Sequence, residues 1–425
     1  MTTGNNDGSA TYGGILSGVN ASLLKRGGGT QTLTGNNTFS GGVEVNNGTL
    51  AVSSVTTAGV AQPLGMGVGD ILFSGPAGLS ITGAGAYSFE RGLILADNFS
   101  TLTVAGTVTH TAPISGGGSS ATLIKVGAGT YNQSATGAWN SNIFITEGTW
   151  NVTPSGSINN AGVIQVSGGA TFNIGTSTQV RGSSVDIISG TVNLDAGTLR
   201  TNGLSVAGGS AFNWSAGTIT MQTDASGSSG STDRRAPGSS LSALPVYEGR
   251  IVSVTGMASL AVPAGGTLDL GLTYGSLGMR YDQFQLAGSL DLSSADNTLV
   301  FEFNPFFFRP SSFGVDGAGT LILIDATALN GTFETFTGVV SDYIGFSAAP
   351  GSGSVVGTLG MSTLNPLTDI PQNTYYLEYE TDSGNLLFHY HLTATIPEPA
   401  SAGLLVAGGL LLRVLGRRKR GIAAG

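Results

Sequence analysis

Three side chains that could hold a divalent metal ion lie in a predicted β-hairpin near the end of the chain. Two segments of alternating character, 375–380 and 386–392, flank an Asp-Ser-Gly-Asn turn. Pairing the first and last residues of that turn places Glu378 opposite His389, and His391 falls on the same face. One carboxylate and two imidazoles suit a transition metal, although a solvated strand face explains the same spacing more simply. We therefore expect no cofactor and keep these three residues as a candidate metal site.

Cleavage of a glycosidic bond needs two acidic side chains that face one another across the substrate. Between residues 100 and 223 the acidic residues are Glu147, Asp186 and Asp195, and they fall at different phases of a repeat of about 20 residues. Segment 65–70, Gly-Met-Gly-Val-Gly-Asp, has the look of a phosphate-binding loop, but neither a Lys nor a helix follows it, which favours a turn. His110 stands alone in a Thr-rich strand and is interpreted as structural. The sequence thus predicts no catalytic residue and no enzyme.

The composition favours strands over helices. Of 425 residues, 69 are Gly and 14 are Pro, and both types resist the interior of a helix. Only 10% of the residues are charged while 40% are hydrophobic, so the chain is not disordered by charge. There is no cysteine, which excludes a disulfide framework, a thiolate zinc site and a cysteine nucleophile. A chain of this length is expected to form two or more domains or an elongated repeat.

A short repeat runs through the middle of the chain. The segment Gly-Thr-Trp-Asn-Val at 148–152 is echoed by three later units, and apolar and polar residues alternate in each. The shared Asn stands at positions 151, 173, 193 and 213. This pattern marks half-buried strands between glycine turns and predicts an all-β fold, a right-handed β-helix or solenoid. Residues 21–220 would make about ten coils, a rod of the order of 50 Å. The aligned Asn side chains either form an internal amide ladder or mark turns.

A longer repeat links two early parts of the chain. Residues 24–30 match 124–130, and 48–52 match 148–152, on both sides of a degenerate middle. The first unit opens with Lys-x-Gly-x-Gly-Thr, continues with Leu-Thr-Gly-Asn-Asn-Thr-Phe-Ser-Gly-Gly and closes with Gly-Thr-Leu. Matches of this density indicate a true repeat.

The first unit resembles the autotransporter-associated β-strand repeat, and the likeness extends over about residues 12–152. The second copy departs from the pattern at 135–140, where Ala-Thr-Gly-Ala-Trp-Asn replaces the centre. The resemblance implies a β-helical stalk of exported surface proteins, with no catalytic residue to carry over. A self-translocating autotransporter would need a long C-terminal series of barrel strands, which the tail of this chain excludes.

The C-terminal tail combines a short motif, an apolar segment and a basic cluster. Pro397, Glu398 and Pro399 precede an apolar helix over 400–416, about 25 Å long and therefore at the short limit for a membrane span. The basic cluster that follows consists of Arg417, Arg418, Lys419 and Arg420. Such a cluster stops transfer and keeps this end in the cytoplasm, so everything before Pro397 lies outside the inner membrane.

This tail resembles the PEP-CTERM sorting signal of Gram-negative bacteria, carried by Pro397-Glu398-Pro399, the apolar segment and the final basic cluster. The resemblance implies a precursor anchored in the inner membrane, recognised by an exosortase at the Pro-Glu-Pro motif, cleaved there and delivered to the cell surface or extracellular matrix.

The chain divides into five predicted segments. They are autotransporter-associated repeats over 1–152, further β-helix coils over 153–222, a polar linker over 223–244, a C-terminal β region over 245–396 and the sorting signal over 397–425. The C-terminal β region is either a β-sandwich cap or more coils. Residues 1–10 have neither a basic nor an apolar stretch, so we expect a truncated N-terminus with a signal peptide upstream.

The charge distribution bears on partners. The tail holds one acid against five bases, and the other residues hold 24 acids against 11 bases. An acidic body does not suit nucleic acid, whose phosphates require clustered Lys and Arg. We expect a structural or adhesive surface protein whose partners, besides exosortase and the inner membrane, include exopolysaccharide or other surface proteins. The alternative is a polysaccharide lyase or hydrolase on the same scaffold, which a convergent carboxylate pair would support.

Overall fold

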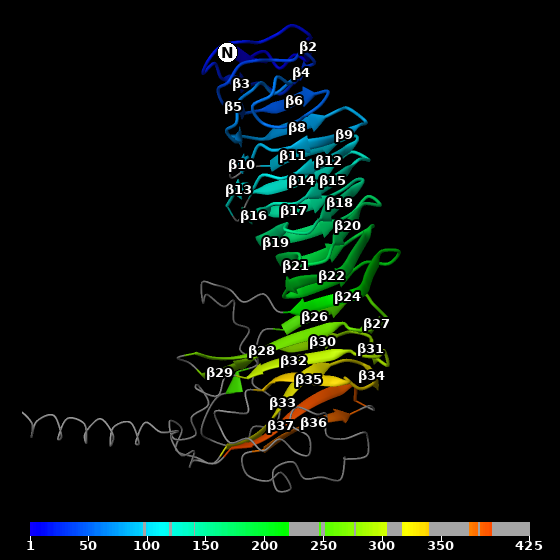
Figure 1. Ribbon diagram of the computed structural model, residues 1–425. Helices are drawn as coiled ribbons and strands as arrows, with labels where there is room; N and C mark the ends of the chain where they lie inside the picture. Colours follow the sequence, from blue (N-terminus) through cyan, green and yellow to red (C-terminus); the bar gives the residue numbers. More distant parts are fainter. Residues whose placement is uncertain are drawn as a thin grey trace, which may run out of the picture.

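The computed structural model describes residues 1–96, 99–118, 121–139, 141–220, 246–247, 251–275, 278–303, 317–339, 374–380 and 383–392. Every regular element in these residues is a β-strand. The strands follow one elongated stack, from the blue N-terminal coils to the orange C-terminal hairpin (Figure 1). The predicted all-β solenoid of right-handed type is confirmed over the described residues.

Strands of successive coils pair in parallel, so that they stack into three columns with the rest of each coil serving as the crossover between paired strands. The first column begins with β1 (Thr2–Thr3), β3 (Leu23–Lys25), β5 (Val43–Val45), β7 (Ile71–Phe73), β10 (Leu93–Leu95), β13 (Ile114–Gly116) and β16 (Thr136–Trp139). The second begins with β2 (Ala10–Tyr12), β4 (Thr30–Leu33), β6 (Gly48–Val52), β8 (Ala77–Ile81), β11 (Phe99–Val104), β14 (Thr122–Val126) and β17 (Asn142–Ile145). The third begins with β9 (Ala86–Phe89), β12 (Thr107–His110), β15 (Thr130–Gln133), β18 (Thr149–Val152) and β20 (Thr171–Ile174).

Four long strands turn a corner of the solenoid, and their two halves pair in different columns. They are β19 (Ser157–Val166), β21 (Gln179–Ile187), β22 (Thr191–Thr201) and β24 (Ala211–Thr220). The halves of β19 and β21 belong to the first and second columns, and those of β22 and β24 to the third and first. The stack is therefore continuous through the middle of the rod.

The pairing register gives the length of a coil. Asn151 lies 19 residues after Asn132 in the third column, and the next three steps of that column are 22, 20 and 20 residues. The predicted period of about 20 residues is therefore confirmed in this part of the chain. One early coil is longer, because Val43 pairs directly with Ile71. Its additional residues fold back on the coil before, where Asn37 and Gln62 form an antiparallel bridge.

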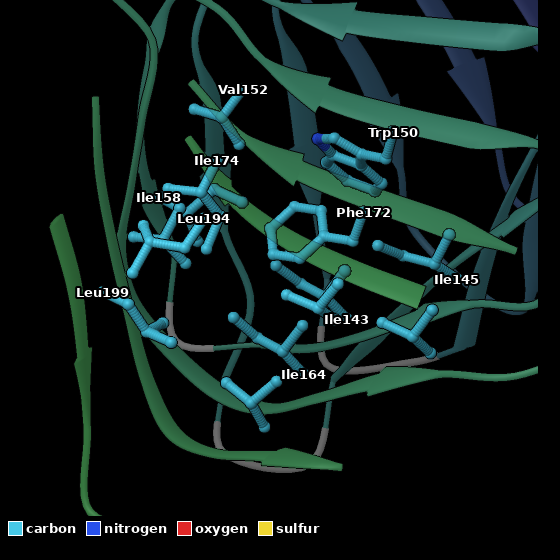
Figure 2. Close-up of a cluster of buried hydrophobic side chains, with 14 of the residues drawn as sticks. Ile143, Ile145, Trp150, Val152, Ile158, Ile164, Phe172, Ile174, Leu194 and Leu199 are labelled. Atoms are coloured by element: carbon cyan, nitrogen blue, oxygen red, sulfur yellow. The ribbon is translucent and has the colours of Figure 1, made fainter. Parts of the chain in front are cut away.

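Alternation of side chains supplies the core. In the third column Trp150, Phe172 and Val192 point inward and are fully buried, while their neighbours along each strand are partly exposed. Figure 2 shows Trp150 and Phe172 on successive coils, with Ile143 and Ile164 facing them across the interior. Because every second residue of a strand points inward, each coil adds its apolar residues to one continuous core.

The coils continue beyond the gap after residue 220. In this region β26 (Ile251–Thr255) pairs in parallel with β23 (Gly203–Val206), and β28 (Thr267–Gly275) pairs in parallel with β24. The columns then extend through β30 (Gln283–Leu286), β32 (Thr298–Phe303), β33 (Gly317–Asp325) and β35 (Thr335–Val339). A separate parallel sheet contains β27 (Ser259–Ala261), β31 (Ser289–Leu292) and β34 (Ala328–Gly331). Of the two forms expected for the C-terminal β region, the described residues adopt further coils.

Between named strands of the described residues, antiparallel pairing appears only towards the C-terminal end of the stack. Strand β29 (Gly278–Tyr281) turns back on β28 and also pairs in parallel with β25 (Val246–Tyr247). Strands β36 (Thr374–Glu380) and β37 (Asn385–Leu392) form a hairpin that lies antiparallel on β33 at the foot of the stack (Figure 1). This hairpin covers the edge of the last described coil, an edge that would otherwise offer unpaired backbone groups to another chain.

The predicted hairpin is confirmed, but the predicted register is wrong by two residues. Asn385 pairs with Glu380, which places His389 opposite Tyr376 rather than opposite Glu378. The turn is displaced because Gly384 packs closely on Ala326, and the amide of Ala326 donates to the Gly384 carbonyl at 3.1 Å. Contacts with another part of the chain therefore override the turn preference of the local sequence.

Several predicted elements lie outside the described residues. They are the motif at 397–399, the apolar helix over 400–416, the basic cluster at 417–420 and the linker over 223–244. Among the residues that the structure does describe, no helix has the length and apolar character needed to cross a membrane.

Candidate functional site

A buried lysine joins two successive coils in each copy of the long repeat. The Lys25 side chain is fully buried, and its ammonium donates to the carbonyls of Arg26 and Gly27, at 2.7 Å each, and of Asn47 on the next coil, at 3.0 Å. An ammonium has three N–H groups, so these three acceptors satisfy it completely. We call this arrangement a lysine clamp.

The second copy of the repeat builds a corresponding clamp, in which Gly129 replaces the equivalent of Arg26 as one of the three acceptors. Lys125 is fully buried and donates to the carbonyls of Gly127, Gly129 and Glu147, at 2.5, 2.7 and 2.8 Å. In both copies the third acceptor lies 22 residues after the lysine, one coil further along the rod. The spacing of the repeat therefore encodes a charged cross-link between coils.

Glycines surround the clamp because no side chain fits there. Gly148 has a φ of +64°, and a Cβ at this position would lie 2.5 Å from the carbonyl oxygens of Gly127 and Gly129 and 2.6 Å from the Lys125 Nζ. Gly48 occupies the same place in the first copy, with a φ of +66°. The Lys-x-Gly-x-Gly-Thr opening of the repeat and its Gly-Thr end, one coil later, thus pack against each other around the lysine ammonium. Both motifs are visible in the sequence, but the contact between them is not.

Burial shifts the titration of the clamp lysines. Desolvation lowers the pKa of Lys125 to about 8, and the negative charge of Glu147 opposes this shift. Desolvation also lowers the pKa of Lys25, which Asp7 opposes. Lys125 remains protonated at neutral pH, so it acts as a hydrogen-bond donor and not as a base.

His110 belongs to an aromatic stack inside the solenoid. Its ring lies 4.7 Å from that of Phe89, and the Tyr131 ring, 5.9 Å away, in turn contacts Trp150 at 4.9 Å. Nδ1 of His110 lies 2.5 Å from the Tyr131 hydroxyl, and Nε2 lies 2.9 Å from the carbonyl of Arg91. The carbonyl can only accept, so Nε2 carries the proton and Nδ1 accepts from Tyr131. His110 is thus a buried, neutral, structural residue.

We expect the unfolding free energy to fall as the pH drops from 6.5 to 4. Desolvation lowers the pKa of His110 from 6.5 to about 4, so between these values the unfolded chain binds a proton that the folded chain excludes. The loss reaches about 3 kcal/mol, at 1.36 kcal/mol per pKa unit. Urea unfolding at several pH values measures it.

The variant His110→Phe is the control for this titration. A phenyl ring keeps the stacking on Phe89 and removes the titratable group. The slope of stability against pH should flatten between pH 6.5 and 4, whatever the absolute stability of the variant. An unchanged slope would show that another group causes the acid sensitivity.

An asparagine ladder runs along the outer face of the third column. The Nδ2 atoms of Asn151, Asn173, Asn193 and Asn213 donate to the Oδ1 atoms of Asn132, Asn151, Asn173 and Asn193, at 2.7, 2.6, 2.7 and 2.8 Å. Of the two arrangements considered for these residues, the structure has the amide ladder, but on the outer face and not inside the solenoid. The alternation of Thr149–Val152 turns Trp150 and Val152 inward, which leaves Asn151 on the solvent side.

A threonine column lies beside the ladder. Thr107, Thr130, Thr149, Thr171 and Thr191 pair with one another in succession, two residues before the ladder column. All five are partly exposed. We call this two-column surface the Thr/Asn face; within strands β12, β15, β18 and β20 it contains no Asp, Glu, Lys or Arg.

The acidic residues considered for catalysis lie in different places. Glu147 accepts from the amide of Gly127 at a glycine corner. Asp195 lies two residues after the ladder residue Asn193 in β22 and accepts from Ser215 on the next coil. Asp186 lies in the second column, in register with Gln165 and Ser205. Segment 65–70 begins as the expected turn, with the Gly65 amide donating to Gln62 at 2.8 Å.

The metal candidate is placed only in part. The backbones of Glu378, His389 and His391 lie in β36 and β37, and their side chains fall outside what the structure describes. In the described part of the chain, no group of three His, Cys, Asp or Glu side chains could hold a metal ion.

Comparison with known proteins gives a match at the first lysine clamp. No match to the PEP-CTERM signal was found, and neither a curated protein nor a solved structure matches the chain. The matching segment begins at β3, which carries Lys25, and ends at β6 on the next coil, so it contains one complete clamp. Residues 23–52 are similar to the passenger-associated transport repeat family.

Proposed function

We propose that the protein is an exported structural or adhesive component of the cell surface or extracellular matrix, without catalytic activity. The observation that carries the proposal is the passenger-associated transport repeat at 23–52, built into a continuous rod of stacked coils. A solenoid of this kind gives a long, stiff body whose outer faces repeat at each coil. Such a body suits a stalk or scaffold that presents the same polar surface many times.

The proposal includes a sorting step at the C-terminal tail. The apolar segment over 400–416 would anchor the precursor in the inner membrane, with Arg417, Arg418, Lys419 and Arg420 in the cytoplasm. An exosortase would then recognise Pro397-Glu398-Pro399 and release the rod to the surface. The order of motif, apolar segment and basic cluster at the end of the sequence supports this step.

We expect the mature protein from its native cell to end near residue 397 and to fractionate with the surface or matrix. Intact mass and cell fractionation measure both properties. In the double variant Pro397→Ala, Pro399→Ala the full-length precursor should accumulate in the inner membrane, because the cleavage motif is lost while the apolar segment remains.

The variant Pro154→Ala is the matched control, because it removes an exposed proline from the body of the rod. It should be processed like the wild type. A full-length species in the inner membrane in all three strains would overturn the sorting step and leave a membrane-anchored stalk.

A further inference from the structure

The Thr/Asn face is a regular array of hydrogen-bonding groups, and the ladder leaves half of its capacity free. An amide has two N–H donors and two acceptor lone pairs, and the ladder uses one of each in Asn151, Asn173 and Asn193. Each of these residues therefore keeps one donor and one acceptor for another molecule. That pair matches two neighbouring hydroxyl groups of a sugar, one of which accepts while the other donates.

The ladder also fixes these groups in place. Every amide donates in the same sense, towards the N-terminal coils, and the first, Asn132, points its Nδ2 at Thr109 Oγ1 at 3.4 Å. Hydrogen bonds in such a chain polarise and hold one another. The side chains thus lose little conformational entropy when a ligand arrives, because they are ordered beforehand.

The face is open along the direction of the rod. Glycine corners precede its strands, and a Cβ added at Gly169 or Gly209 would meet no other atom within 4 Å. At these two corners no side chain obstructs a ligand that passes from one coil to the next. A chain-like ligand can lie across several coils, whereas a compact ligand would contact only one or two.

The charge of the protein around this face favours a neutral ligand over an acidic one. The strands β12, β15, β18 and β20 carry no charged residue, since His110 is buried and neutral. The nearby acids are Glu147, just before β18, and Asp195, two residues after Asn193 in β22, and both are exposed. Residues 1–396 as a whole hold 24 acids against 11 bases. An acidic polymer would be repelled at this surface, and a neutral one would not.

The spacing between coils also fits a neutral, chain-like ligand. Neighbouring strands lie about 4.8 Å apart, so two coils span about 10 Å, the length of one disaccharide unit in an extended β-linked glycan. The five ladder residues from Asn132 to Asn213, one on each coil and here called rungs, extend over roughly 20 Å, which is enough for about four sugars.

We propose that the Thr/Asn face binds a neutral, extended polysaccharide along the axis of the rod. This inference rests on the proposed surface function and names the ligand class for it. Each rung contributes a weak, hydrated contact, and several rungs engaged by one chain give the affinity.

Titration calorimetry with neutral β-1,4-linked glucose oligomers tests the proposal. We expect affinity to rise steeply from the disaccharide to the tetrasaccharide and to change little beyond it. The triple variant Asn151→Thr, Asn173→Thr, Asn193→Thr should bind at least tenfold more weakly. Threonine is compatible with the column, because Thr109 occupies the same column one coil before Asn132.

Controls separate the alternatives. Gln165→Ala changes a polar residue of the second column that is likewise partly exposed, and this variant should bind like the wild type. Oligomers of acidic alginate should not bind. Equal binding by the triple variant, or equal binding of alginate, overturns the proposal, as does a wild-type dimer that the triple variant converts to a monomer in sedimentation.

The sugar titration is independent of the sorting experiment. Absent binding by a protein that reaches the surface normally would remove the ligand and leave the proposed function intact. Binding by a protein that never leaves the inner membrane would do the reverse.

Discussion

The variant Lys125→Met should lose about 3–5 kcal/mol of unfolding free energy, the usual cost of breaking a buried charged interaction from one side. Methionine fills much the same volume as the lysine stem, so no large cavity forms. What is lost is the set of three donors to Gly127, Gly129 and Glu147. The Gly129 carbonyl still accepts from the Thr149 amide at 3.2 Å, so the cost falls on the carbonyls of Gly127 and Glu147. A buried carbonyl group without a partner costs about 1–3 kcal/mol.

Hydrogen exchange is the most informative readout for this variant. In a solenoid each coil contacts only its neighbours, so destabilisation is concentrated near the altered coil. Exchange should accelerate around 125–152 and change little in the first clamp, which Lys25 holds separately. Urea unfolding supplies the overall free energy.

The exposed Arg26 provides the matched control for charge. Arg26→Met removes one positive charge from the same repeat and should change stability by less than about 0.5 kcal/mol, as surface substitutions usually do. If Lys125→Met proved no more damaging than Arg26→Met, the clamp would have no energetic role.

In the repeat region the coils could be predicted from the sequence, but the role of the buried lysine could not. The spacing of strands along 148–214 was sufficient to predict parallel coils, because the period of alternation and the period of the repeat agree with one fold. The clamp lysine could be recognised in the sequence only as a residue shared by the two copies of the repeat, Lys25 and Lys125. Its role depends on acceptors from its own turn and from the next coil, a combination that local pattern does not reveal.

The asparagine column could have been placed correctly from the sequence. In Thr149–Val152 the two apolar residues, Trp150 and Val152, alternate with Thr149 and Asn151, so the period of two puts the Asn outside. The hairpin register is different. It depends on the packing of Gly384 against Ala326, which lies far away in the chain, and no local rule contains that contact.

The variant Gly148→Ala should be as damaging as removal of the lysine. An alanine at a φ of +64° is strained by roughly 1–2 kcal/mol, and overpacking costs about 1–3 kcal/mol more. Its methyl group would also displace the Lys125 ammonium, which a Cβ would approach within 2.6 Å. We therefore expect a loss of about 3–5 kcal/mol, with faster exchange in the two coils that the clamp joins.

Gly169→Ala separates the two causes of this loss. Gly169 has a φ of +76°, similar to that of Gly148, but a Cβ there meets no atom within 4 Å. The variant Gly169→Ala suffers only the backbone strain, so its unfolding free energy should fall by only about 1–2 kcal/mol. Equal losses in the two variants would mean that left-handed backbone, and not the space around the lysine, is what the glycine supplies. A larger loss at Gly148, with exchange enhanced at Gly127 and Gly129, would show that the repeat keeps glycine there to leave room for the clamp.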